Sequence, residues 1–262
     1  MAPIDSRDAQ DRPFRVHLTG FGPFRDIKHN PSWLAVEPLD GQILTESPPP
    51  LSGHAPTASP RRRSPRRPIL LSTSLLPVEY TAVEHLAPRL QQPDHKEETP
   101  PPELVIHVGV SAGDSAIRLE QRARKFGYNS LDAAGNLAPS TRSEDVDVEG
   151  ARRGFVGEEW EAAPEELRTV VDADKVIRWV KSQGVAFISQ SDDAGLYLCE
   201  YSFFASMATA IRLNPANPTP VQFIHVPPVG QPYSAEELTR AIRLIVWAIV
   251  EEALPHRGEA SE

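Results

Sequence analysis

The sequence has little cysteine and no long hydrophobic run. Its 262 residues contain one cysteine, Cys199, which excludes an intramolecular disulfide and any metal site built from several cysteines. The longest apolar stretch, residues 242–254, contains three charged residues and is too short to span a bilayer. The N-terminal segment MAPIDSRDAQDRPFR has no apolar core behind its charges, so it predicts no secretory signal. Together these absences predict a soluble, cytoplasmic protein.

The sequence also has fewer basic than acidic residues, 27 Lys and Arg against 36 Asp and Glu. The formal net charge is -9 at pH 7, so the surface as a whole should repel nucleic acid and anionic membranes. We therefore expect neither of them as a partner, and a small, weakly charged molecule instead. Hydrophobic residues make up 40% of the composition, which is enough for one well-packed domain.

The hydrophobic pattern alternates between strands and helices. Strand-like segments are expected at residues 14–18, 69–76, 103–110, 116–120, 185–190 and 221–226. Helical spacing is expected at 32–39, 78–90, from Asp172 or Asp174 to 183, at 196–213, and from a capping box at Ser234 and Glu237 onward. This alternation implies an α/β layered domain with a largely parallel sheet.

Two segments and the two ends do not fit this alternation. Residues 40–68 are rich in Pro, Ser and Arg and predict a disordered insertion, while 141–171 predict an acidic, irregular insertion. The catalytic domain would span 14–255, with flexible tails at 1–13 and 256–262. Within the first insertion, RRRSPRR could be a nuclear-targeting or phosphorylation-regulated segment, but in an acidic chain a solvated linker is the commoner case.

Three residues at the expected strand ends could form a nucleophilic site, since sites collect beyond the carboxyl ends of parallel strands. Cys199 follows a strand and would lie in a helix's first turn, where free N–H groups favour a thiolate and could hold an oxyanion. His225 ends a strand and could be the base, with His107 as a competitor, and Glu120 could orient it. Each has a common structural alternative: a buried small hydrophobe, a core histidine, a solvated glutamate.

Five ordered motifs link these residues. They are VHLTGFGPFRDIKHNPSWLAV, PVEYTAVEHLAPRL, LVIHVGVSAGDSAIRLE, DAGLYLCEYSFFAS and FIHVPPVGQPYSAEEL. The set resembles pyroglutamyl peptidase I, a family of intracellular cysteine peptidases that remove N-terminal pyroglutamate. A dinucleotide-loop interpretation of TGFGPF is weaker, because a third glycine is missing and Pro23 lacks an N–H. The resemblance implies a single α/β/α sandwich with a largely parallel twisted sheet, and no metal or organic cofactor.

The resemblance also implies roles for individual residues. Cys199, His225 and Glu120 match the family's catalytic triad of nucleophile, base and orienting carboxylate. The chain would then be an exopeptidase acting on N-terminally pyroglutamylated peptides through a thioester intermediate.

A substrate pocket is implied in the same way. Phe21 and Phe24 match the family's ring-binding aromatics, and Tyr197 lies at another pocket position. Asn30 would fix a loop, and the backbone of Val110 would meet the lactam. Ordinary core packing is the commoner role for a phenylalanine.

The cysteine loop departs from the family pattern. At SQSDDAG it is two residues longer, which could shift the start of the cysteine helix. The alternative to an active peptidase is a catalytically silent family member that binds peptides or another protein, although the intact triad residue types argue against it. The oligomeric state stays open.

Overall fold

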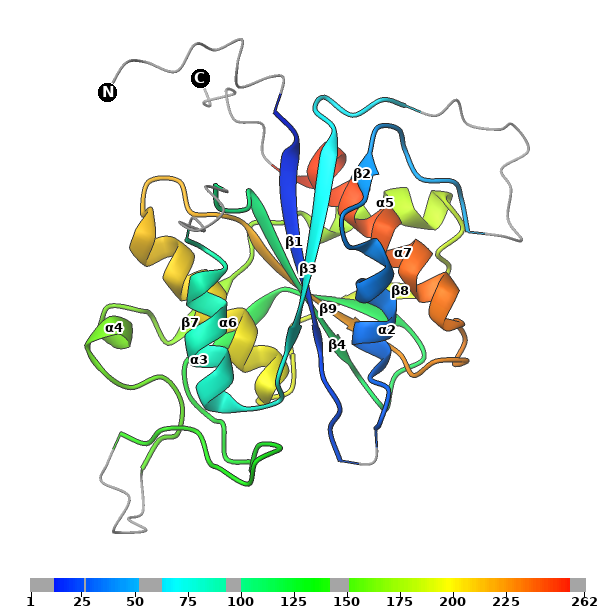
Figure 1. Cartoon of the computed structure of the whole chain (residues 1–262). Helices are drawn as coiled ribbons and strands as arrows, with labels where there is room; N and C mark the ends of the chain where they lie inside the picture. Colours follow the sequence, from blue (N-terminus) through cyan, green and yellow to red (C-terminus); the bar gives the residue numbers. More distant parts are fainter. Residues whose placement is uncertain (1–11, 26, 52–62, 93–99, 142–150, 255–262) are drawn as a thin grey trace.

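A seven-stranded sheet forms the centre of the molecule (Figure 1). The computed structural model describes residues 12–25, 27–51, 63–92, 100–141 and 151–254. In spatial order the strands are β2 (Ile43–Leu44), β3 (Ile69–Leu76), β1 (Phe14–Phe21), β4 (Leu104–Val110), β9 (Val221–Val226), β5 (Ile117–Glu120) and β8 (Ile188–Ser191). Among the described residues of this sheet, the β2–β3 and β5–β9 pairs are antiparallel and the other pairs are parallel. The expected largely parallel sheet is therefore confirmed.

Helices cover both faces of this sheet (Figure 1). One face carries α2 (Pro31–Val36), α5 (Ala173–Ser182) and α7 (Ala235–Ala248), and the other carries α3 (Tyr80–Arg89) and α6 (Leu198–Leu213). Each face has its own apolar core, and β9 is buried along its whole length. Burial on both faces explains why the central strands have continuous apolar runs instead of alternation. The α/β/α sandwich of a single domain is confirmed.

The helix ends follow the expected capping chemistry. Asp172 rather than Asp174 caps α5, where its side chain accepts a hydrogen bond from the Lys175 N–H at 3.0 Å. Ser234 and Glu237 form both hydrogen bonds of a capping box at the start of α7. Short helical turns extend α2 and α7 as η1 (Glu37–Leu39) and η2 (Ile249–Ala253).

The prediction of a disordered insertion across 40–68 is wrong at both of its ends. Strand β2 pairs with β3, and Leu44 and Leu51 are buried in the core. Arg67 forms an ion pair with Glu103 and donates hydrogen bonds to the carbonyls of residues 12 and 13. Isolated leucines among prolines can therefore anchor a segment that composition alone would call disordered. Residues 52–62, 1–11 and 255–262 lie outside the described residues.

The prediction that 141–171 is irregular is also wrong in part. This segment contains α4 (Glu158–Glu161) and β7 (Glu166–Arg168), and β7 pairs with β6 (Arg122–Arg124) in a second, two-stranded sheet. Phe155 and Trp160 are fully buried, with ring centroids 4.8 Å apart. Two large aromatic rings suffice to fix a segment whose other residues are polar. Residues 142–150 lie outside the described part of the chain.

Two further findings bear on function. No helix in the described ranges is long and apolar enough to cross a lipid bilayer. Within the same ranges, no group of three or more His, Cys, Asp or Glu side chains is arranged to hold a metal ion.

Candidate active site

Cys199 is the second residue of α6. The preceding residues turn the chain sharply, with Gly195 at φ 95° and Leu196 at φ 47°, both in the left-handed region. Tyr197 is the N-cap and makes no side-chain capping bond. The first N–H groups of a helix have no partner within it, and they surround the Cys199 thiol with positive potential. The expected position in the first helical turn is confirmed.

Gly109 lies directly against the nucleophile, a role that sequence reasoning missed. It is part of β4, in register with His225 on the neighbouring strand β9. A Cβ atom at this position would lie 2.8 Å from the Cys199 sulfur and 2.8 Å from the Phe223 ring. A glycine inside a continuously buried strand marks such a close approach and could have been noticed.

His225 and Glu120 form a buried pair on adjacent strands. The imidazole Nδ1 lies 2.8 Å from Glu120 Oε1, and both side chains are almost inaccessible to solvent. The Cys199 thiol also acts electrostatically on the imidazole, and because Glu120 engages Nδ1, Nε2 is the ring nitrogen left for the sulfur. Burial alone would lower the pKa of His225, but Cys199 and Glu120 outweigh burial and raise it above its usual value.

His107 is a structural histidine. Its Nδ1 lies 2.7 Å from the Thr19 hydroxyl and its Nε2 lies 2.6 Å from the Ser206 hydroxyl, so both ring nitrogens are engaged. Burial lowers the pKa of His107 to about 3, which keeps the ring neutral. The geometry therefore favours His225 over His107 as the base.

The five predicted substrate-binding residues line one cavity beside the thiol. Its volume is about 300 Å³, and Phe21, Phe24, Asn30, Val110 and Tyr197 all contribute to its wall together with Cys199. Sequence reasoning missed the remaining lining residues, which are Arg25, Ile27, Val78, Ala112 and Leu198. The structure thus brings together segments from β1, β4 and the start of α6.

The aromatic wall has a defined geometry. The ring centroids of Phe24 and Tyr197 lie 5.4 Å apart, and the Arg25 guanidinium carbon lies 4.7 Å from the Phe24 centroid. The Tyr197 hydroxyl donates to the Leu131 carbonyl at 3.0 Å. Burial raises the pKa of Tyr197 to about 12, so this phenol is uncharged at neutral pH.

Asn30 fixes the loop that carries the two phenylalanines. Its Oδ1 caps α2 by accepting the Ser32 N–H at 3.1 Å, and its Nδ2 donates to the Gly22 carbonyl at 3.0 Å. Ser32 in turn accepts the Phe21 N–H at 2.9 Å. Because Asn30 is buried and bonded on both sides, its geometry fits the expected loop-fixing role.

A thiol at a helix N-terminus, a histidine bonded to a buried carboxylate and an adjoining cavity together define a cysteine-type hydrolase. No protein-family model matches the chain. Human (Homo sapiens) pyroglutamyl-peptidase 1 is 31% identical over 240 residues, which cover 91% of this chain and 89% of that protein. The chain belongs to the pyroglutamyl-peptidase 1 family.

Two solved structures have the same fold. A mutant pyrrolidone carboxyl peptidase from Pyrococcus furiosus gives a TM-score of 0.65 at 22% identity, covering 92% of this chain and all of that one (100%). Pyroglutamyl peptidase I from Bacillus amyloliquefaciens gives 0.63 at 21% identity, covering 90% and 96%. The fold match therefore extends over nearly the whole chain.

Proposed function

We propose that this protein hydrolyses the bond after an N-terminal pyroglutamyl residue, with Cys199 as nucleophile, His225 as base and Glu120 as orienting carboxylate. The observation that carries the proposal is the buried Glu120–His225 hydrogen bond, with the Cys199 thiol electrostatically coupled to the imidazole and lining an apolar cavity. Nothing in the described structure favours the alternative of a catalytically silent binding module.

The first half of the reaction forms a thioester. Because Glu120 accepts from Nδ1–H, the imidazole Nε2 is free to take the Cys199 proton. The thiolate attacks the carbonyl carbon of pyroglutamate, and N–H groups in the first turn of α6 stabilise the resulting oxyanion. As the carbon–nitrogen bond breaks, the imidazolium gives its proton to the leaving amine, which departs as the shortened peptide.

The second half restores the enzyme. Water enters as the peptide leaves, and His225 Nε2 removes a proton from it while the oxygen attacks the thioester carbonyl. The carbon–sulfur bond breaks, free pyroglutamate forms, and the proton returns to the sulfur. Glu120 keeps its hydrogen bond to Nδ1 and favours the positive imidazole in both halves.

The cavity suits a neutral lactam better than a free N-terminus. A desolvated ammonium group needs an acidic partner, and the lining residues that the structure describes include no carboxylate. Arg25 adds a positive charge at the wall. The lactam can instead pack its ring against Phe21 and Phe24 and direct its N–H and C=O at backbone groups such as those of Val110.

A cytoplasmic location is part of this proposal. The proposed nucleophile must stay a reduced thiol, and the cytosol maintains that state. Cytoplasmic peptides with an N-terminal pyroglutamyl residue would then be the substrates.

Two matched substrates test the proposal. Prolyl-coumarin amide has a ring of the same size as pyroglutamyl-coumarin amide but an ammonium group in place of the lactam amide. We expect kcat/KM for the pyroglutamyl substrate to exceed that for the prolyl substrate by at least about 100-fold, since an unpaired buried charge costs several kcal/mol. Equal or faster turnover of the prolyl substrate would contradict the proposed specificity.

A further inference from the structure

The loop that precedes Cys199 has an unusual backbone conformation. It runs from the end of β8 to the N-cap of α6 and includes the end of the SQSDDAG segment, which we expect to be two residues longer than the family pattern. Leu196 lies three residues before the nucleophile and has φ 47°, a left-handed backbone conformation that residues other than glycine rarely adopt. A non-glycine residue in this region is sparsely populated and persists only when its surroundings hold it.

Glu200 stabilises this turn from the buried side. It is the third residue of α6, directly after Cys199, and its side chain is fully buried. Its Oε2 accepts the Leu196 N–H at 2.9 Å, which fixes the strained turn in place of a capping bond from Tyr197. The Leu196 side chain packs against Gly127, where a Cβ would lie only 2.9 Å from Leu196 Cδ2.

Arg124 balances the Glu200 charge. Its Nε lies 2.7 Å from Glu200 Oε1 and its Nη2 lies 2.8 Å from Oε2, while its backbone N–H donates to the same carboxylate at 2.9 Å. A planar guanidinium fork matches a carboxylate in this way and lysine does not. The pair matters for the thiol, because an uncompensated carboxylate beside Cys199 would oppose thiolate formation.

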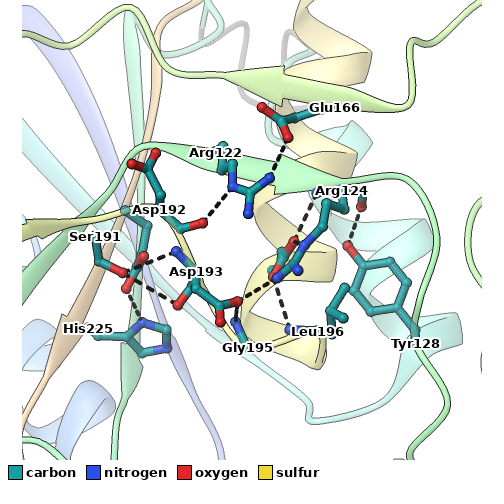
Figure 2. A network of polar contacts seen from close by, with 12 residues as sticks. Arg122, Arg124, Tyr128, Glu166, Ser191, Asp192, Asp193, Gly195, Leu196 and His225 are labelled. Carbon is teal, nitrogen blue, oxygen red and sulfur yellow. Dashed lines mark hydrogen bonds and ion pairs between the residues drawn. The ribbon is translucent and has the colours of Figure 1, made fainter.

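Asp192 and Asp193, in the loop before α6, bond it to the neighbouring strands from outside. Figure 2 shows Arg122 and Arg124 reaching from one short strand, β6, toward the cysteine loop. Arg124 Nη2 also pairs with the Asp193 carboxylate, and Arg122 Nε donates to the Asp192 carbonyl at 2.6 Å. Arg168 on β7 binds the Asp192 carboxylate at 3.0 Å. The loop before α6 is therefore bonded to β6 and β7 through both of its aspartates.

Residues 120–124 contact both the base and the helix turn that carries the nucleophile. Glu120 ends β5 and binds His225, and four residues later Arg124 on β6 binds Glu200 next to Cys199. The partner of the base and the partner of Glu200 therefore both lie within residues 120–124.

We propose that Arg124 and Glu200 are positioning residues that fix the strained turn and the first turn of α6, so that Cys199 meets His225, and that Asp193 reinforces them from the loop. This inference rests on the proposed function for its kinetic test only. A thiol-reactivity test does not depend on the substrate.

The main experiment measures two quantities on Arg124→Gln, Arg124→Lys and Glu200→Gln. The first is the rate of iodoacetamide alkylation against pH, which reports on Cys199 alone because the chain has no other cysteine. The second is the split between kcat and KM for pyroglutamyl-coumarin amide. The ionisable groups of the site that bear on the alkylation profile are His225, Glu120, Asp114, Glu200, Arg124, Asp193, Tyr197 and Arg25.

The two variants that remove one charge of the Arg124–Glu200 pair should shift the alkylation profile in opposite directions along the pH axis. Arg124→Gln leaves the Glu200 carboxylate uncompensated, so the acid limb of the alkylation profile should move to higher pH. Glu200→Gln leaves the Arg124 cation uncompensated, so the limb should move to lower pH. In all three variants kcat should fall, by about 100-fold where the turn shifts by an ångström, while KM changes little. Arg124→Lys keeps the charge, so its alkylation profile should stay near wild type.

Two further variants serve as comparisons. Asp193→Asn removes an exposed charge and should lower kcat by about two- to fivefold. Arg152→Gln removes an exposed ion pair with Glu165 and should behave as wild type. Thermal melts and the folded fraction are measured for every variant, and Asp193→Asn keeps the test decisive if the buried variants do not fold.

Different outcomes would refute the positioning role of Arg124 and Glu200 and the proposed peptidase activity. Unchanged kcat and alkylation in folded Arg124 and Glu200 variants, with only a lower melting temperature, would overturn the inference. So would an Asp193→Asn variant identical to Arg152→Gln in kcat and reactivity when the buried variants do not fold. Wild-type protein that alkylates normally but hydrolyses no pyroglutamyl substrate would instead refute the proposed function.

Discussion

Replacing Gly109 by alanine should displace the nucleophile without altering any ionisable group. The new Cβ would lie 2.8 Å from the Cys199 sulfur and 2.8 Å from Phe223 Cζ. Comfortable non-bonded contacts begin near about 3.5 Å, so each neighbour must give way by roughly 0.7 Å. Phe223 is fully buried, so it can recoil only by straining the core.

The size of the effect follows from this displacement. A shift approaching an ångström at a reacting atom costs up to about 100-fold in rate, so we expect kcat for pyroglutamyl-coumarin amide to fall by 10-fold to about 100-fold. Overpacking against Phe223 should cost about 1–3 kcal/mol in unfolding free energy. Steady-state kinetics and denaturant unfolding measure the two losses separately.

Gly113→Ala is the matched control, because nothing lies within 4 Å of a Cβ at that position. A double variant, Gly109→Ala with Phe223→Leu, removes the ring clash but not the sulfur clash, so it should recover stability and not activity. Wild-type kcat in the folded Gly109→Ala variant would refute the close approach of β4 to the nucleophile.

Three other expectations follow from the structure. Glu120→Gln should lower kcat by orders of magnitude and move the alkaline limb of the kcat/KM profile to lower pH, because the carboxylate helps to raise the pKa of His225; an unmoved limb would contradict that coupling. His107 has a pKa lowered to about 3 by burial, so the unfolded chain binds its proton first, and stability should fall as pH drops from about 6.5 toward 3, by up to about 1.4 kcal/mol per pH unit. Denaturant unfolding at several pH values should show a shallower slope in a folded His107→Gln variant, and an identical slope would refute this assignment. Gly154→Ala should destabilise the fold by more than about 2 kcal/mol, since its Cβ would lie 2.1 Å from the Lys125 carbonyl oxygen, and a wild-type melt would show that this segment is not packed as described.

The main elements could be predicted because their signals are local. Continuous apolar runs identified β4 and β9, and side-chain caps at Asp172 and Ser234 identified the starts of α5 and α7. The sequence motifs also selected residues that the structure brings to one cavity, although nothing in the chain near Phe21 indicates that Tyr197 lies beside it. That proximity depends on the crossing of strands and was implied only by the family resemblance.

The features that the sequence did not predict depend on contacts between segments that are distant in the chain. Leu51 and Trp160 lie in stretches whose composition suggests disorder or irregularity, yet each is buried against residues far away in the sequence. Arg124 and Glu200 read separately as ordinary surface charges, and only the tertiary structure pairs them across 76 positions. Charge compensation of this kind has no periodicity that a sequence pattern could reveal.

The most direct measurement is the turnover of pyroglutamyl-coumarin amide by wild-type protein and by Cys199→Ala under reducing conditions. Cys199 is the only thiol in the chain, so no other cysteine can replace it. We expect hydrolysis by the wild type and a loss of at least about 10,000-fold in the folded variant, as when a nucleophile is removed from a catalytic triad. Retained turnover in Cys199→Ala would contradict the assignment of the nucleophile, and a folded wild-type protein without turnover would contradict the proposed activity.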